Sequence, residues 1–245
     1  MKMRIMIMVW LLALVTGGMA SAAEDGGKLK VLLVTGGHEF EPGPFFRVFK
    51  ANSNITFTAA SQDKSSEAYE RDDLLSYDVV VLYDMVQKIS DTQKTRFMAL
   101  FDKGVGLVVM HHALCSYQDW PEFRRIIGGK YLLSEEKEGE KTWPKSDYQH
   151  DVDVPVQIVA KDHPITAGLE DFTIHDEIYM NFRTQPDVTA LITTTHPKSG
   201  KPLAWCRTQG KSRVVYLQLG HDHQAYENPS YRQIVARSIQ WAAPR

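Results

Sequence analysis

Residues 30–37, KVLLVTGG, form an uninterrupted apolar and β-branched run that stops at a pair of glycines. The same pattern recurs at residues 78–83, DVVVLY, and at residues 106–111, GLVVMH. Strands buried on both faces have such continuous runs, whereas strands with one solvated face alternate apolar and polar residues. The three runs therefore predict the central strands of a parallel sheet that helices cover on both sides.

Around these runs, strand-like and helical patterns alternate along the chain. Residues 91–103 have apolar side chains at helical spacing, with Ser90 as a suitable N-cap and Gly104 as a suitable stop. We expect further strands at 55–60, 152–160, 174–180, 189–194, 202–207 and 213–219, and further helices at 44–50, 121–127 and 231–241. This order predicts a single α/β domain over residues 28–243.

Residues 134–150 interrupt the alternation, because SEEKEGEKTWPKSDYQH is highly charged and has no apolar period. We expect a surface loop here. It is either a solvated excursion or a lid over a ligand site, since Trp143 and Tyr148 are large aromatic residues in an otherwise polar stretch.

The first 23 residues have the pattern of a signal peptide. Two basic residues precede an apolar run at 5–15, and small residues then lead to a cleavage point near Ala22-Ala23. The run is shorter than the roughly 20 apolar residues that span a bilayer, and a retained N-terminal anchor is the alternative. We expect an exported protein, periplasmic or secreted.

Charge and motif content narrow the classes of partner. The formal net charge is −2, which argues against a nucleic-acid partner, because such a partner favours a basic face. The chain has neither a G-x-G-x-x-G nor a G-x-x-x-x-G-K-[ST] sequence, so we expect no nucleotide. The two cysteines, Cys115 and Cys206, make no disulfide framework, and their pairing stays open, as does assembly into a homo-oligomer.

Histidines follow three of the predicted strands. His38 comes after the first run, His111 and His112 end the run at 106–111, and His221 and His223 follow the last strand. Ligands of open α/β sheets bind beyond the carboxyl ends of the strands. We therefore expect these imidazoles to converge on one edge of the sheet, although a lone histidine at a strand end is more often a hydrogen-bonded structural residue.

Two chemistries use such a cluster. Imidazoles bind a divalent ion such as zinc or manganese, and His38, His111 and His221 are then the expected ligands. Alternatively, histidine and carboxylate act as general acid and base on a sugar hydroxyl or on a carbon next to a ketone. The chain has no H-E-x-x-H zinc signature, so both chemistries stay open.

Ordered segments of the chain resemble the trehalose-utilisation (ThuA-like) family, among them VLLVTGGHEF at 31–40, the stretch at 104–129, DHPITAGL at 162–169 and HDEIYMN at 175–181. The resemblance covers nearly all of the chain after the leader. It implies a three-layer α/β/α flavodoxin-like sandwich with a mostly parallel sheet, related to class I glutamine amidotransferases. It also implies a carbohydrate substrate such as a 3-keto glycoside.

The resemblance disfavours a glutaminase mechanism. Class I glutamine amidotransferases present a nucleophilic cysteine on a G-x-C-x-G elbow after the fourth strand. Here the corresponding stretch is Val109-Met110-His111-His112-Ala113, so a histidine replaces that cysteine, and Cys115 lies beyond the elbow.

The positions that match the family are His38, His111, Asp176, Glu177, Tyr179, His221 and Asp222. We expect the catalytic groups to be His38, His111, Asp176, Glu177 and His221. We expect sugar contacts from His112, Trp120, Tyr179, Asp222, His223 and Tyr226. Two alternatives stay open: a non-catalytic carbohydrate-binding or accessory protein, and an amidase or amidotransferase-like hydrolase that uses Cys115.

Overall fold

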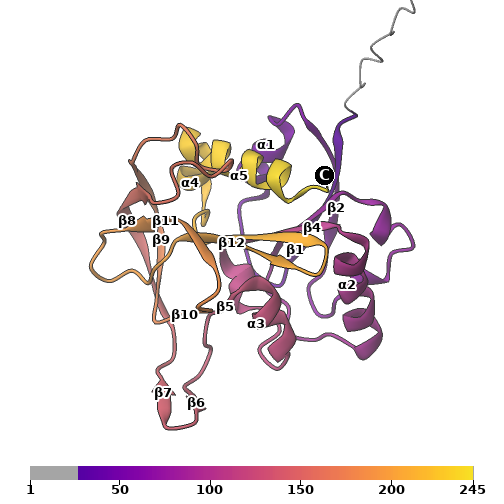
Figure 1. Ribbon diagram of the computed structural model, residues 1–245, viewed down its shortest axis with the longest axis horizontal. Helices are drawn as coiled ribbons and strands as arrows, with labels where there is room; N and C mark the ends of the chain where they lie inside the picture. The colour runs from indigo at the N-terminus through magenta and orange to yellow at the C-terminus, as the bar shows by residue number, and fades with distance from the viewer. Residues whose placement is uncertain (1–26, 245) are drawn as a thin grey trace, which may run out of the picture.

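The computed structural model describes residues 27–244, so the predicted signal peptide at 1–23 lies outside the described residues. In the described part a nine-stranded sheet has the order β2-β1-β3-β4-β13-β12-β11-β8-β9 (Figure 1). One half is parallel: β1 (Leu29–Gly36), β2 (Ile55–Ser61), β3 (Val79–Asp84), β4 (Gly106–Met110) and β13 (Ser212–Leu217). This half contains the three runs on which the fold prediction rested.

The other half of the sheet is antiparallel. It continues from β13 through β12 (Ala204–Gln209), β11 (Thr189–Thr194), β8 (Asp147–Ile158) and β9 (Phe172–Met180). Two short ribbons stand beside it, one of β5 (Gly129–Lys130) with β10 (Arg183–Thr184), the other of β6 (Glu136–Glu138) with β7 (Lys141–Trp143). The α/β sandwich is confirmed, and its sheet is mixed.

Helices cover both faces of the sheet (Figure 1). One face packs on α1 (Pro42–Lys50), α4 (His223–Glu227) and α5 (Pro229–Ala242), the other on α2 (Asp91–Lys103) and α3 (Pro121–Ile127). Single turns of 3₁₀ helix complete the layers: η1 (Glu67–Glu70), η2 (Leu74–Ser76) and η3 (His111–Cys115). None of the helices in residues 27–244 has the length and apolar character needed to cross a membrane.

The continuous runs are buried on both faces, as predicted. In β1, Val31 and Leu33 belong to the core under α5, whereas Leu32 and Val34 belong to the core under α2. Successive side chains of a strand point to opposite faces, so only a run without polar residues satisfies both cores.

The helix predicted at 91–103 is confirmed together with both of its ends. The Ser90 hydroxyl accepts a hydrogen bond from the Gln93 backbone N–H, and the Gln93 side chain returns a bond to the Ser90 N–H. Gly104 ends the helix in the left-handed conformation at φ 91°, a conformation that glycine adopts without steric cost.

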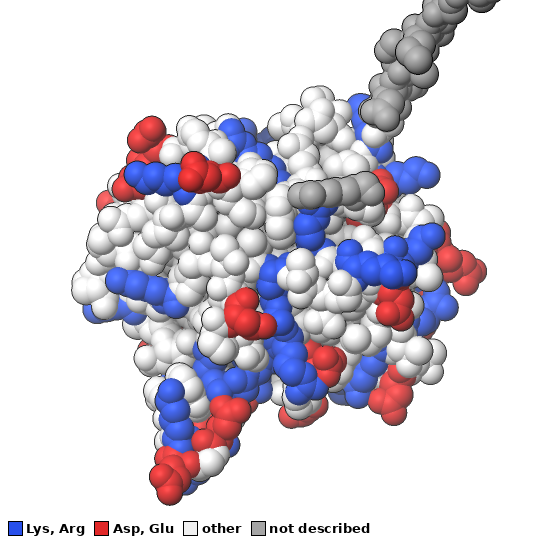
Figure 2. All heavy atoms as spheres, viewed as in Figure 1, with Lys and Arg blue, Asp and Glu red and all other residues white. Residues whose placement is uncertain are grey.

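The surface loop predicted at 134–150 is wrong as a secondary-structure assignment. β6 and β7 pair as a hairpin that projects from the body (Figure 1), and β8 already begins at Asp147. Ion pairs stabilise the hairpin in place of an apolar face, because Glu136 contacts Lys130 and Arg183. Acidic and basic side chains are interspersed along it in Figure 2. A strand pair held by charge has no apolar period to detect.

Candidate functional site

His111 occupies a strained turn at the carboxyl end of β4. The strand was expected to extend through residue 111, but it ends at Met110, and His111 begins η3 with φ 50°. A positive φ is uncommon in residues other than glycine and costs on the order of 1–3 kcal/mol. The turn places a buried imidazole, 1% exposed, at the sheet edge, where the resemblance implied a nucleophile elbow.

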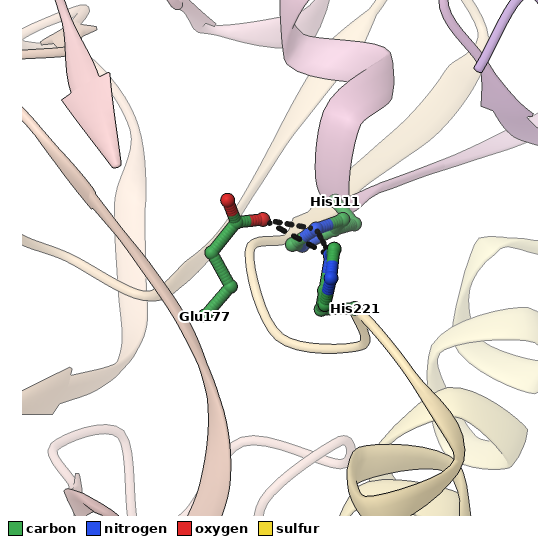
Figure 3. Close-up of side chains that lie close together, drawn as sticks. All are labelled: His111, Glu177 and His221. Atoms are coloured by element: carbon green, nitrogen blue, oxygen red, sulfur yellow. Dashed lines mark hydrogen bonds and ion pairs between the residues drawn. The ribbon is translucent and has the colours of Figure 1, made fainter. Parts of the chain in front are cut away.

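Three side chains from separate elements meet at this edge (Figure 3). Glu177 comes from β9, His111 from the end of β4, and His221 from the loop after β13. Glu177 Oε2 lies 2.8 Å from His111 Nε2 and 3.2 Å from His221 Nδ1, and the two nitrogens are 3.3 Å apart. We call these three residues the triad.

A buried clamp fixes the loop that presents His221. The Asp176 carboxylate accepts hydrogen bonds from the Gly220 N–H at 2.8 Å and from the His221 N–H at 2.9 Å. The Tyr226 hydroxyl donates to the His221 carbonyl at 2.8 Å. Burial raises the pKa of Asp176, and these backbone donors oppose that shift. Asp176 and Tyr226 therefore act as positioning residues.

Hydrogen bonding sets the charge distribution of the triad. His111 Nδ1 donates to the Gln218 carbonyl at 2.6 Å, so Nε2 is the nitrogen that faces Glu177. Burial disfavours the ionised carboxylate of Glu177, but hydrogen bonds from His111 and His221 outweigh it and hold its pKa well below the usual range. The hydrogen bond to Glu177 raises the pKa of His221 in turn.

A cavity of about 570 Å³ opens over the triad. Its lining residues are His38, Glu39, Phe40, Glu41, Met85, His112, Cys115, Tyr131, Leu133, Tyr148, His150, Glu177, Tyr179, His221 and Asp222. Four of the predicted site residues therefore line it besides Glu177 and His221, namely His38, His112, Tyr179 and Asp222. Tyr148, which the lid interpretation singled out, stands on its wall and is 52% exposed.

His38 lies in this cavity but apart from the three donor atoms. Its ring stacks on that of His112 with centroids 4.5 Å apart, and its Nδ1 bonds to the Glu39 carbonyl. Burial, with a smaller contribution from the charge of His111, lowers the pKa of His112 well below the usual range. Of the predicted ligands His38, His111 and His221, the structure brings together the last two, and Glu177 takes the third place.

Of the other residues predicted to contact a sugar, some line the cavity and some lie outside it. Tyr179 stacks on His111 with centroids 5.0 Å apart, and Asp222 caps α4 while it lines the cavity. Trp120 lies outside the cavity and stacks on Phe123. His223 is also outside it, at the surface, where its Nδ1 lies 3.0 Å from a Glu41 oxygen.

His150 is a cavity residue that the strand-end argument missed. Its Nδ1 lies 3.6 Å from Glu177 Oε1, and its ring lies 4.5 Å from the His221 ring. It sits at an irregularity in β8, where the pairing with β9 shifts between Gln149 and Val152. A histidine in a charged stretch, away from the carboxyl end of any predicted strand, gives no sequence signal of this role.

Cys115 has none of the features of an activated nucleophile. It lines the cavity, but burial raises its pKa far above the usual range, so the thiolate is not accessible near neutral pH. Both Cys115 and Cys206 are free thiols. The thiol of Cys206 has its pKa raised to about 11, also by burial.

Comparison with known proteins gives a family and a set of fold neighbours. The model of the ThuA family, described as trehalose utilisation, matches residues 30–242. No curated protein sequence matches the chain.

Solved structures with the same fold include two ThuA-like proteins. One, from Parabacteroides merdae, has a TM-score of 0.72 at 21% identity and covers 88% of this chain and 90% of its own. The second, from Bacteroides uniformis, has a TM-score of 0.66 at 18% identity, covering 92% and 95%. A β-galactosidase from Rahnella sp. R3 matches 89% of this chain with only 32% of its own, at a TM-score of 0.58 and 15% identity. At these identities the likeness shows the fold alone.

Proposed function

Since the chain belongs to the ThuA, or trehalose-utilisation, family, we propose that it processes a carbohydrate, with a 3-keto glycoside as substrate. The observation that supports this proposal is the triad beside a cavity of about 570 Å³, which Glu177 and His221 line. The cavity is large enough for a sugar and has aromatic walls beside charged groups, a combination typical of ligand sites. The signal-peptide pattern at 1–23 supports action outside the cytoplasm.

The chemistry of a 3-keto glycoside suits the groups in the cavity. The ketone acidifies the C–H at C2, which lies between the ketone and the glycosidic carbon. A base removes that proton, the C1–O bond breaks, and the departing oxygen takes up a proton, giving an unsaturated keto sugar and a free alcohol. This elimination consumes no co-reactant, because the proton removed and the proton added balance.

Two groups of residues would carry out proton removal and stabilisation of the ketone oxygen. His38 donates from Nδ1 to the Glu39 carbonyl, so its Nε2 is free to accept a proton from the substrate. The triad supplies positive charge for the ketone oxygen, either as protonated imidazoles or through a bound divalent ion. Burial of Glu177 and His111 strengthens that charge by excluding water.

The test is turnover of a 3-keto glycoside by tag-free protein, measured by the release of the alcohol. We expect His221→Ala to lower turnover by roughly 10³-fold. We expect His175→Ala to leave it intact, because His175 pairs with Asp153 outside the cavity. Sugar binding without turnover by the unmodified protein would favour a non-catalytic binding protein instead.

A further inference from the structure

The spacing of the three donor atoms in the triad is that of a metal site. The edges of the triangle formed by His111 Nε2, His221 Nδ1 and Glu177 Oε2 measure 2.8, 3.2 and 3.3 Å. Bonds of about 2.0–2.1 Å in a tetrahedron place neighbouring ligand atoms about 3.3 Å apart. One ion can therefore bond to all three atoms with no more than small side-chain shifts.

The three side chains also point toward one another (Figure 3). His111 donates its Nδ1 proton to the Gln218 carbonyl, so Nε2 is the ring nitrogen that faces Glu177, and a bound ion would replace the proton that Nε2 donates to the carboxylate. In residues 27–244 the groups that approach the Glu177 carboxylate oxygens are imidazoles, from His111, His150 and His221. Protons on both His111 and His221 would place two like charges 3.3 Å apart in a buried site, whereas one cation satisfies all three donors together.

Hydrogen bonds from neighbouring groups fix the positions of the proposed ligands, as they do in known metal sites. The Gln218 carbonyl fixes the His111 ring from behind, and the Asp176 clamp fixes the backbone of His221. Such outer partners orient ligands and raise their basicity. Glu177 and His221 face the cavity, so coordination positions stay open toward it, as they do at catalytic zinc sites.

We propose that His111, Glu177 and His221 bind one divalent transition-metal ion, with Zn²⁺ as the reference ion. Two imidazoles and one carboxylate suit zinc, manganese or iron better than Mg²⁺, which prefers an all-oxygen octahedron. The proposal deepens the proposed function, because the ion would polarise the ketone oxygen of the sugar. Ion binding itself is independent of which sugar is the substrate.

The experiment measures metal directly and needs no substrate. Tag-free protein purified without chelators is assayed by mass spectrometry for bound metal. It is then stripped with EDTA and titrated with Zn²⁺, and in parallel with Mg²⁺, by calorimetry. Co²⁺ loaded in place of Zn²⁺ gives a visible absorption spectrum that reports nitrogen and oxygen ligation.

Two ligand variants and one matched control complete the design. His221→Ala is expected to fold, because the side chain is 26% exposed, and Glu177→Gln keeps the shape of the buried residue. Each should weaken Zn²⁺ binding at least about 100-fold, because loss of an outer partner alone costs about 10–100-fold. His175→Ala changes a half-buried histidine on β9, the strand of Glu177, and this variant should bind Zn²⁺ as the unmodified protein does.

The outcomes separate this proposal from the proposed function. Near-stoichiometric Zn²⁺ that is lost in both ligand variants and kept in His175→Ala supports it. A protein that neither contains nor takes up Zn²⁺, or one whose affinity is the same in both variants, overturns it. Sugar turnover by a protein without metal would overturn the metal site but support the proposed function. Tight Zn²⁺ binding without turnover of any glycoside would support the metal site but contradict the proposed function.

Discussion

The two halves of the sheet differ in how they contribute to the site. The parallel half supplies His111 and His221 from points just beyond the ends of β4 and β13. The antiparallel half supplies Glu177 from within β9, and His150 from an irregularity in β8. A strand-end rule therefore finds the first pair but misses His150, and it does not place Glu177 among the ligands. The antiparallel strands extend past the edge at which the parallel strands stop.

The prediction with the largest expected effect tests whether the two halves of the sheet contribute equally to catalysis. Glu177→Gln from the antiparallel half and His221→Ala from the parallel half should each lower kcat/KM on a 3-keto glycoside by roughly 10³-fold, because each removes a partner from one charged centre. The double variant should lose little more, since groups that act as a unit are non-additive. Steady-state kinetics on all three variants measures this.

Additive losses in the double variant would contradict a single centre. So would a Glu177→Gln enzyme with near-normal turnover, which would confine the chemistry to the parallel half. His175→Ala is the control for changes to β9.

A second prediction concerns a buried acid in the parallel half. Asp84 ends β3, accepts a hydrogen bond from the Gln62 amide, and burial raises its pKa from 3.8 to about 7. The folded state thus holds its proton more tightly than the unfolded state does, so this residue makes stability fall as pH rises from about 4 to about 7. The total effect is on the order of 1–4 kcal/mol.

Asp84→Asn should remove that dependence, because an amide mimics the neutral acid. The variant should be more stable than the unmodified protein at pH 8, and the difference should vanish near pH 4. Urea unfolding at a series of pH values measures both. A variant that is less stable at pH 8 would show that the ionised carboxylate stabilises the folded state and that burial does not raise the pKa of Asp84.

A third prediction concerns Asp176, whose carboxylate links the antiparallel and parallel halves of the sheet. Asp176 on β9 accepts N–H bonds from Gly220 and His221 in the loop after β13. An amide has one acceptor oxygen, so Asp176→Asn should leave one buried N–H unpaired and lower the free energy of unfolding by roughly 2 kcal/mol. Equilibrium urea unfolding measures the loss. No change in stability would mean that the loop holds its position without this clamp.

The smallest effect is expected at Cys115. Cys115→Ala should change kcat/KM by less than about twofold and stability by about 1 kcal/mol, the cost of a small core truncation. Complete alkylation in the unfolded state, with little labelling of the folded protein, would agree with its burial. Loss of turnover on replacement would instead favour a cysteine-dependent hydrolase and break the assignment of the triad.

The sequence by itself determined the layered α/β fold, because unbroken apolar runs and helical periods each satisfy local and packing requirements at once. The runs at 30–37 and 106–111 became β1 and β4, and residues 91–103 became α2 with the predicted cap. The edge on which His111 and His221 meet also followed, because parallel strands end on the same side.

Only the tertiary structure decided which groups complete the site. The pairing of β8 with β9 brings Glu177 and His150 to the triad, and stacking on His112 holds His38 apart from the donor atoms. Trp120 and His223, expected at the sugar, turned out to stack on Phe123 and to pair with Glu41. Contacts between strands far apart in the chain set these positions, and register and side-chain direction across such pairs leave no periodic trace in the sequence.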